Sequence, residues 1–425
     1  MFAVTATRAP FADALRVREF RWLWLAGIQS QAGDQLARVA LSVLVFERTG
    51  SALQTALVYA LTFVPALIGA TALSWLADRF PRRQVMIVAD GCRALLLAAM
   101  AIPRLSVVVL CALLVGAVLI GSPFGAAQTA LLPDILGERF VTGAGLRMIS
   151  DQLTQVLGFA LGGAAVAAIG ARGGLLVDAA SFLVSASIIA IAVQRRPAPT
   201  AGRHAAPEPR GAWIAVATIA RDRRLRALLA LGWLAGCYIV PEAVAAPYGR
   251  SIGAGVGGVG LLLSAIPLGG AVGALILVVW TPKKARERLI APLALFAGLP
   301  LAGCWWGPGL AASASLWALS GAASAFQVVA ATSFVSATPD AVRARCVAVA
   351  AAGVLAIQGL GALAGGWLGE QIGAGKAVAV AGLFGAFLAI PCGLAWLAVL
   401  RVSTSTVAGG SGRRRSPSHA SEDNG

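Results

Sequence analysis

The sequence predicts an all-α polytopic membrane protein, with twelve transmembrane helices in two pseudo-symmetric six-helix halves. Of its 425 residues, 58% are hydrophobic and only 12% are charged, and the mean hydropathy is +0.82. Soluble domains are about 45–50% apolar and about 25% charged. Apolar stretches of about 20 residues, long enough to cross the hydrocarbon layer as a helix, recur along the chain. The period-two pattern of barrel strands is absent, so helices are the expected spanning elements.

The apolar stretches fall into two groups of six. The first group lies near 21–46, 52–77, 84–103, 106–132, 143–170 and 174–194, and the second near 226–249, 255–280, 288–306, 309–335, 343–371 and 376–400. The expected organisation is therefore an N-terminal segment 1–20, an N-terminal half 21–194, a Pro- and Arg-rich linker 195–225, a C-terminal half 226–400 and a disordered tail 401–425. No cleaved signal peptide is expected, because no apolar core precedes a small-residue cleavage site.

The distribution of basic residues predicts the orientation. With the N-terminus inside, most of the 34 Lys and Arg residues lie on the cytoplasmic side, as the positive-inside rule requires. Five would lie outside: Arg48, Arg104, Arg172, Arg250 and Lys376. Both termini, the linker and the tail are therefore expected in the cytoplasm. The net charge of +16 is then mainly topological, and nucleic-acid binding is not expected because the arginines are spread over many loops.

The chain also contains an internal repeat. "QVLGFALGGAAVAAIGA" (155–171) aligns with "QGLGALAGGWLGEQIGA" (358–374), so that Gln155 matches Gln358 and three glycines coincide: Gly158, Gly162 and Gly163 with Gly361, Gly365 and Gly366. Both segments are the fifth helix of their half. Parallel repeats of this kind are typical of transporters whose halves rock around a central site. Ordinary close packing of glycine-rich helices is the alternative explanation.

The stretch "LADRFPRRQV" (76–85) connects the second and third helices on the predicted cytoplasmic side. It resembles the pattern Gly-x-Leu-Ala-Asp-Arg-x-Gly-Arg-Arg/Lys of the major facilitator superfamily. The acid and the basic positions match, namely Asp78, Arg79, Arg82 and Arg83. Ser74 and Pro81 replace the two glycines. Two further stretches, "TALLPDILGERF" (129–140) and "LLVDAASFLVSASI" (175–188), resemble the branch that includes bacterial siderophore exporters and drug-efflux proteins.

The resemblance implies a cytoplasmic gate. In the family this acid faces the N-terminal end of the eleventh helix, which is expected to begin near Val342 here. Unpaired N–H groups give that end a partial positive charge. Asp78 would thus tie the halves together inside and favour the outward-open state, while the arginines anchor the loop at anionic lipid. The matching loop of the second half, 280–289, is basic but lacks the acid. A purely topological role is the alternative.

Charged residues inside the apolar helices are the strongest functional signal, because they are unfavourable in lipid. Asp34 and Arg38 lie four apart in the first helix, so they share a face and can form a pair. Gln31 and Gln35 lie beside them. We expect Asp34 to line the central cavity and to take up a proton or hold a cationic group. A structural ion pair is the alternative.

The other buried acids of the N-terminal half have a structural explanation. Asp90 and Arg93 lie three apart on the third helix and are expected to form a structural pair. Asp151, on the fifth helix, is a candidate for another buried ion pair or for the inner gate. Asp178 lies near the outer end of the sixth helix and is expected to have a packing or capping role.

Three further polar residues are candidates for a role in coupling or in the cavity. Glu242 follows Pro241, which can interrupt the seventh helix and free a carbonyl group. Glu242 is therefore a candidate for coupling or for substrate binding. Gln155 and Gln358 are expected to form hydrogen bonds either in the cavity or between helices.

We therefore expect a secondary active multidrug-type exporter of small amphipathic molecules (a drug, a siderophore or a secondary metabolite) in the bacterial cytoplasmic membrane, working by proton antiport with alternating access. Two observations weaken proton coupling by the family's usual residues: the fourth helix lacks a basic residue, and "GFALGG" lacks the expected proline. An importer or facilitator for a polar solute, and a non-transporting membrane partner or sensor, are the alternatives. The expected partners are the substrate, a proton or other coupling ion and the lipid bilayer, with the protein a monomer. No enzyme activity, metal or cofactor is expected, because no triad, nucleotide loop or metal cluster occurs.

Overall fold

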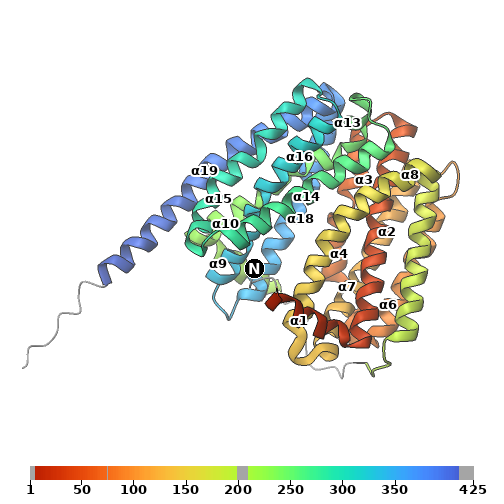
Figure 1. Cartoon of the computed structure of the whole chain (residues 1–425), viewed down its shortest axis with the longest axis horizontal. Helices are drawn as coiled ribbons and strands as arrows, with labels where there is room; N and C mark the ends of the chain where they lie inside the picture. The colour runs from red at the N-terminus through yellow and green to blue at the C-terminus, as the bar shows by residue number, and fades with distance from the viewer. Residues whose placement is uncertain (1–4, 74, 199–208, 411–425) are drawn as a thin grey trace, which may run out of the picture.

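The computed structural model describes residues 5–73, 75–198 and 209–410, and this part of the chain is helical without strands. Figure 1 shows the helices gathered into two bundles. The first contains α1 (Thr5–Arg16), α2 (Arg18–Thr49), α3 (Ala52–Ala60), α4 (Val64–Ala72), α5 (Leu76–Arg79), α6 (Arg82–Met100), α7 (Val107–Leu136), the 3-10 turn η1 (Gly137–Arg139) and α8 (Phe140–Ala192). The second contains α9 (Pro209–Arg221), α10 (Arg223–Trp233), α11 (Ala235–Tyr238), α12 (Val240–Ala243), α13 (Ala245–Ser251), α14 (Val256–Trp280), α15 (Lys283–Gly298), η2 (Pro300–Trp306), α16 (Leu310–Ser324), α17 (Phe326–Ala337), α18 (Arg343–Ile372) and α19 (Ala374–Gly410).

The helices confirm the predicted fold class. Eight helical segments of the described chain are long and apolar enough to cross a membrane. One of them, Val107–Ala192, is 86 residues long and therefore contains more than one crossing. Within it α8 turns back at Gly170, whose φ of 75° and ψ of 165° are open to glycine and strained for other residues. The order of the elements is consistent with the twelve passes predicted.

Four predicted helices are interrupted within the described residues, namely those at 52–77, 226–249, 288–306 and 309–335. The span predicted at 52–77 is divided into α3, α4 and α5, and the span at 226–249 into α10 to α13. Pro65 occupies the first turn of α4, and Pro241 occupies the first turn of α12. Proline has no N–H to donate to the preceding turn, so a helix readily restarts at it. The structure confirms the interruption expected near Pro241, whereas the one before Pro65 was not predicted.

Three boundaries differ from the sequence prediction. Helix α19 continues to Gly410, beyond the predicted end at 400, and the rest of the tail predicted to be disordered, 411–425, lies outside the described residues. Helix α1 lies in the predicted N-terminal segment, and α9 lies inside the predicted linker. Ala215 and Ile219 of α9 are buried, and the Ala215 carbonyl accepts a weak bond from the Cys346 thiol of α18. This packing explains why a short segment bordered by charges is helical.

The repeated glycines pack alike in the two halves. Gly158 lies against Gln35 of α2, where a Cβ on the glycine would approach the Gln35 Cβ to 3.0 Å. Its repeat partner Gly361 lies against Gly236 of α11, with a Cβ-to-carbonyl separation of only 1.8 Å. The fifth helix of each half therefore packs closely on the first helix of the same half. This common arrangement supports a structural repeat, because glycine-rich composition alone would not place the matching glycines against the same helix of each half.

The third pair of repeated glycines, Gly163 and Gly366, joins the two halves. A Cβ on Gly163 of α8 would lie 2.6 Å from the Cα of Gly260 on α14. A Cβ on its partner Gly366 of α18 would lie 2.3 Å from the Cβ of Ala56 on α3. Both contacts leave no room for a side chain. Close helix approach at these two places is therefore part of the interface between the halves.

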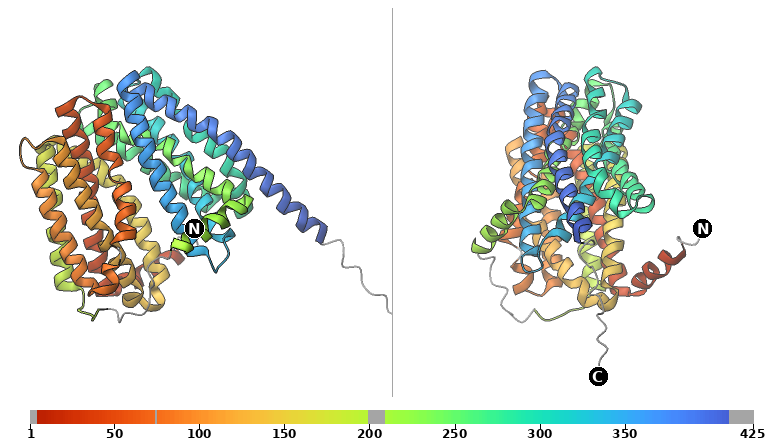
Figure 2. Two further views of the ribbon diagram at one scale, coloured as in Figure 1. Left: turned by 180° about the vertical axis from the view of Figure 1, so that it is seen from behind. Right: turned by 90° about the vertical axis from the view of Figure 1, so that its left-hand side faces the viewer.

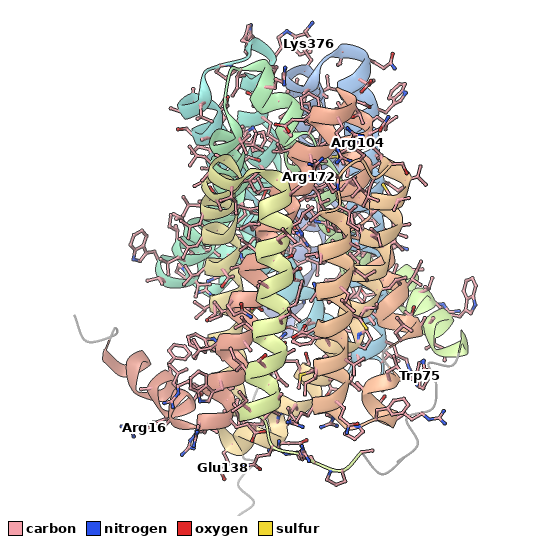
Figure 3. All side chains as sticks on the ribbon, turned by 90° about the vertical axis from the view of Figure 1, so that its right-hand side faces the viewer. Arg16, Trp75, Arg104, Glu138, Arg172 and Lys376 are labelled. Carbon is pink, nitrogen blue, oxygen red and sulfur yellow. The ribbon has the colours of Figure 1, made fainter. Side chains whose placement is uncertain are left out.

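The two halves meet at one end of the molecule and separate toward the other (Figure 2, left). We call the first end the outer end; Arg104, Arg172 and Lys376 mark it in Figure 3. The opposite end, marked by Arg16 and Glu138, is called the inner end (Figure 3). The names follow the orientation that the basic residues predict. Gly163 and Gly366, near the outer ends of their helices, lie where the halves converge.

Candidate functional site

An ion pair between α2 and α6 lies at the centre of the N-terminal half. The Arg93 guanidinium donates to the Asp34 carboxylate over 2.7 Å, and the two side chains are 13% and 36% exposed. The guanidinium also lies 3.9 Å from the ring centroid of Phe182 on α8. One arginine therefore joins three helices. The expected pairs Asp34–Arg38 and Asp90–Arg93 are corrected here, because the long Arg93 side chain reaches across the bundle instead of along its own helix.

Two further carboxylates surround this arginine. Asp90 is fully buried, and neither of its carboxylate oxygens has a hydrogen-bond partner among the described residues. Asp178 is also fully buried and accepts a hydrogen bond of 3.0 Å from Ser181. The sequence predicted only a packing or capping role for Asp178. In the structure this carboxylate also interacts electrostatically with Asp34 and Arg93. Acids thus outnumber the arginine that pairs with them in the interior of a membrane protein.

The three acids are not arranged as a metal site in the part of the chain that the structure describes. Their helices nevertheless approach closely: a Cβ on Gly33 of α2 would lie 2.1 Å from a carboxylate oxygen of Asp178. A buried charge is strongly unfavourable unless it is paired or neutralised. The cluster is therefore suited to hold either a proton or a cationic group beside Arg93.

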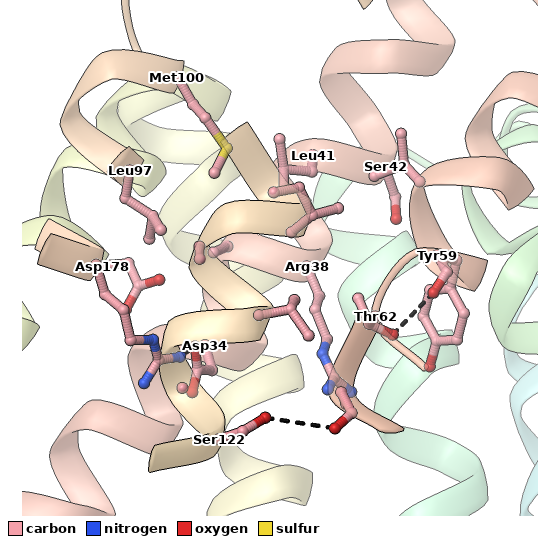
Figure 4. A pocket seen from close by; sticks show the side chains of 18 residues that line it. Asp34, Arg38, Leu41, Ser42, Tyr59, Thr62, Leu97, Met100, Ser122 and Asp178 are labelled. Carbon is pink, nitrogen blue, oxygen red and sulfur yellow. Dashed lines mark hydrogen bonds and ion pairs between the residues drawn. The ribbon is translucent and has the colours of Figure 1, made fainter. Parts of the chain in front are cut away.

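Two cavities meet at the Asp34–Arg93 pair. One, of about 340 Å³, extends toward the outer end and is lined by polar residues that include Tyr59 and Asp178, with apolar walls from residues such as Leu97 and Met100. Figure 4 shows Asp34 and Asp178 on one side of this cavity, and Arg38 and Tyr59 on the other. The second, of about 310 Å³, extends toward the inner end. Both cavities are lined by Asp34, Arg38 and Arg93.

The sequence analysis expected Asp34 to line a central cavity between the halves, and the structure agrees with this in part. Asp34 does line a cavity, but the lining residues of both cavities come from the N-terminal half instead of from both halves. Gln31 and Gln35 line the inner cavity, and the buried Gln35 side-chain oxygen has no hydrogen-bond partner among the described residues. Gln155 and Gln358 are half-buried and line neither cavity. The repeat-related glutamines therefore lie apart from this site.

A second polar contact joins the halves beside the outer cavity. The Tyr59 hydroxyl of α3 donates a short hydrogen bond to the Glu242 carboxylate of α12, and both residues are buried. Arg38 lies close enough to interact electrostatically with both groups. Glu242 lines neither cavity, but its partner Tyr59 lines the outer one. Arg38 is thus placed between the Asp34 cluster and the inter-half contact.

The arginines of residues 76–85 bind the protein at the inner end. Arg82 donates to the Asp134 carboxylate over 2.6 Å and to the Ala130 carbonyl over 2.8 Å. Arg83 donates to the Ala190 carbonyl of α8. The guanidinium of Arg79 lies 5.8 Å from the ring centroid of Trp75. Arg82 and Arg83 therefore fasten α6 to α7 and α8, whereas the sequence suggested contact with lipid.

The acids near the inner end differ in their contacts. The Asp78 side chain is exposed, and its carboxylate makes no hydrogen bond or ion pair with the residues that the structure describes. Asp151 lies 3.9 Å from Arg147 in a half-exposed pair that lines the inner cavity. Glu19 binds Arg196 through two hydrogen bonds, of 2.5 and 2.9 Å, and this raises the pKa of the Arg196 guanidinium. The start of the linker is therefore fastened to α2.

Sequence reasoning missed several polar residues of the cavities. Tyr59 and Ser122 line the outer cavity, and Trp24 and Gln128 line the inner one. Gln128 is buried in α7, which the sequence analysis examined only for basic residues. An intramembrane glutamine was an available signal for Gln128. No comparable signal marked Tyr59, because aromatic residues are common in apolar helices.

Comparison with known sequences gives a family and a more distant functional relative. Residues 23–311 match the profile described as Major Facilitator Superfamily. The multidrug efflux pump Tap of Mycobacterium tuberculosis (strain ATCC 25618 / H37Rv) is 29% identical over 296 residues, which cover 64% of this chain and 68% of Tap. The same protein of Mycobacterium bovis (strain BCG / Pasteur 1173P2) matches with the same identity and coverage.

Solved structures agree on the fold. The nucleoside transporter NupG, as its D323A mutant, has a TM-score of 0.69 at 14% identity, with 89% of this chain and 99% of that chain covered. A bacterial homologue of the human lysosomal transporter Spinster, in an inward-facing and unoccupied conformation, has a TM-score of 0.63 at 15% identity, with coverages of 89% and 95%. At such identities the likeness shows the fold alone.

Proposed function

Because the chain belongs to the major facilitator superfamily and is thus a membrane transporter and not an enzyme, we propose that it exports small amphipathic molecules in exchange for protons. The substrate would be a drug, a siderophore or a secondary metabolite with a cationic group. Residues 21–194 and 226–400 would form the two moving halves, joined by the linker. The chain would lie in a bacterial cytoplasmic membrane as a monomer, with both termini in the cytoplasm.

The observation that carries this proposal is the position of the Asp34–Arg93 pair where two cavities meet. Asp34 is the more exposed partner, so it is open to a ligand or a proton while Arg93 is held over Phe182. A proton on Asp34 would weaken its attraction to Arg93, and a cationic substrate would compete with that proton for the same carboxylate. Competition of this kind is the simplest chemistry for antiport.

Asp90 and Asp178 support the same mechanism. When Asp34 is protonated, the Arg93 guanidinium still has these two carboxylates nearby, so it need not remain unpaired in the interior. Arg38 would transmit the change, since it lines both cavities and also interacts with the Tyr59–Glu242 contact between the halves. Protonation within the N-terminal half could in this way alter an inter-half contact.

The direction of transport rests on the relative that is itself an efflux pump. Tap is described as a multidrug efflux pump, and its match covers 64% of this chain. The apolar walls of the outer cavity, next to acidic groups, suit amphipathic cations better than highly polar solutes.

The test is accumulation of ethidium, a fluorescent lipophilic cation, in cells stripped of their own exporters. We expect wild-type protein to lower ethidium accumulation, and a protonophore to abolish the effect. Asp34→Asn should abolish it as well, because the variant keeps the shape of the side chain but loses its charge and its proton. Asp13→Asn is the matched control, since Asp13 forms an exposed surface pair with Arg16.

Each alternative has its own outcome. Raised accumulation that depends on the protein would indicate import. Unchanged accumulation across a panel of lipophilic compounds, together with no substrate-dependent thermal shift of the purified protein, would indicate a non-transporting partner or sensor. Export that survives Asp34→Asn but not the protonophore would contradict a coupling role for Asp34. Glu242 would then be the next candidate for proton coupling.

A further inference from the structure

The last turn of α18 carries an acid that binds the opposite half. The Glu370 Oε2 atom accepts hydrogen bonds from the Ala52 N–H over 2.8 Å, from the Ser51 hydroxyl over 3.1 Å and from the Leu53 N–H over 3.3 Å. Ser51 to Leu53 form the start of α3 in the N-terminal half. One carboxylate oxygen of the C-terminal half thus caps a helix of the other half.

The contact is favourable for two physical reasons. The first N–H groups of a helix have no partner within the helix, and a carboxylate is their strongest common acceptor. The same N-terminal end carries the positive part of the helix dipole, which attracts a negative charge. On its own helix Glu370 is unfavourably placed, because α18 ends at Ile372 and an acid in the last turn faces the negative end of the dipole. The hydrogen bonds and positive dipole end of α3 compensate for the unfavourable position of the Glu370 charge on α18.

The fold itself does not require this acid. The position that matches Glu370 in the repeat is Ala167, so the pseudo-symmetric contact between α8 and α14 lacks it. Nor does α3 depend on it to begin, because the Ser51 hydroxyl already accepts a hydrogen bond of 3.1 Å from the Gln54 N–H. Close packing at Gly366, one turn earlier on α18, brings the two helices together. Glu370 therefore adds a charge-dependent bond to an interface that glycine packing already forms.

We propose that Glu370 is an outer latch, a residue that holds the outer end of the transporter closed and must release the start of α3 before that end can open. The latch acts only in the outer-closed state, because separation of α3 from α18 breaks all three hydrogen bonds together. It thereby sets the balance between the two states of the transport cycle without touching the substrate. This role is independent of which molecule is carried.

The experiment measures the opening directly by pulsed electron spin resonance. Spin labels are placed at the outer end on Arg172 of the N-terminal half and Trp306 of the C-terminal half, in a full chain whose six natural cysteines are replaced. The distance between the labels is recorded in lipid nanodiscs. For Glu370→Gln, which keeps the side-chain shape but removes the charge, we expect the population with the long outer distance to rise about threefold to thirtyfold.

Glu47→Gln is the matched control. Glu47 is an exposed acid at the outer end of α2, and its carboxylate makes no hydrogen bond or ion pair with the described residues. It should leave the distances unchanged, and Glu370→Asp, which keeps the charge, should restore part of the closed population. If Glu370→Gln matches the parent chain, or only lowers the melting temperature without lengthening the outer distance, Glu370 is a structural cap and the latch is refuted.

Discussion

The contact between the two halves differs at its two ends: the outer end is hydrogen-bonded and closely packed, and the inner end is separated. At the outer end, where α3 meets α18, Glu370 binds the start of α3 and Gly366 lies against Ala56. At the inner end, where α3 to α5 finish and α18 begins, the exposed Asp78 side chain of α5 has no partner among the described residues. Figure 2 shows the ribbons of the two halves apart at this end. Glu370 thus bonds the two halves at the closed end, whereas Asp78 makes no such bond at the separated end of the described chain.

This difference indicates how the halves are held. Glu370 lies in the last turn of α18, where an acid is unfavourable, whereas Asp78 lies in the single-turn helix α5. The structure contains the Glu370 bond, and the resemblance of residues 76–85 implies a corresponding bond of Asp78 when the inner end closes. The two acids would then act in alternate states. Helices α8 and α14 offer a contrast, because they approach closely at Gly163 and Gly260 and the position that matches Glu370 is Ala167.

The largest effect is expected between the two ends, at the Asp34 cluster. Arg93→Gln leaves Asp34, Asp90 and Asp178 without their guanidinium, and an unpaired buried charge destabilises by about 3–5 kcal/mol. The thermal unfolding temperature in detergent should fall clearly and transport should be lost. The double variant Arg93→Gln/Asp34→Asn should recover part of the lost stability but not transport, because Asp90 and Asp178 still lack the guanidinium. Equal unfolding temperatures for wild-type and Arg93→Gln protein would show that Arg93 does not stabilise the buried carboxylates.

The next effect concerns the packing that closes the outer end. Gly163→Val places methyl groups where the Gly260 backbone lies, at 2.6 Å from the added Cβ, and overpacking of this kind destabilises by about 1–3 kcal/mol. The outer label distance should lengthen and transport should fall about tenfold or more. Gly91→Val is the control, because a Cβ on Gly91 meets nothing within 4 Å. Similar behaviour of the two variants would remove Gly163 from the closure mechanism.

A smaller effect is expected at the inner end. Asp78→Asn should leave the outer-closed state intact, because Asp78 makes no bond in it, and should weaken inner closure by about twofold to fivefold, the range of one exposed charge at a helix end. The distance between labels on Glu138 and Ala341 at the inner end reports this change. An Asp78→Asn variant that instead opens the outer end would contradict the division of roles between the two acids.

The smallest effect is expected at Ser51. Ser51→Ala removes one of the three hydrogen bonds to Glu370 and the hydroxyl cap on Gln54, while the two backbone donors remain. The outer-open population should rise about twofold, consistent with the loss of about 0.5 kcal/mol for one exposed hydrogen bond between the halves. The same outer labels measure it. An effect larger than that of Glu370→Gln would mean that the Ser51 cap, and not the carboxylate charge, holds this end.

Local patterns predicted the fold, and contacts between helices decided the site. Hydropathy located the spans because each apolar stretch must cross the same thickness of lipid, and the repeated glycines marked close helix contacts that the structure contains. The partner of Arg93 could not be predicted in this way. Spacing on one helix favoured Asp90, but the guanidinium crosses to Asp34 on α2 and lies over Phe182 on α8.

Glu370 shows the same limit more sharply. In the sequence it is one acid near the end of an apolar helix, which resembles an ordinary solvent-exposed residue. Its importance depends on α3, more than three hundred positions earlier in the chain, beginning beside it. The interruption that separates α3 from α4 is likewise a feature of the folded chain, although Pro65 was an available signal. Long-range placement, rather than residue type, separates these residues from their neighbours.

If the two ends of the transporter close in alternation, with Glu370 at one end and Asp78 at the other, the outer and inner distances must change in opposite directions. The most direct test is to record the outer and inner label distances in the same nanodisc preparations of wild-type, Glu370→Gln and Asp78→Asn protein. The account predicts a short outer and a long inner distance as the major wild-type population. It also predicts that Glu370→Gln lengthens the outer distance while shortening the inner one, and that Asp78→Asn does the reverse. Outer and inner distances that lengthen together, or that respond to neither variant, would contradict it.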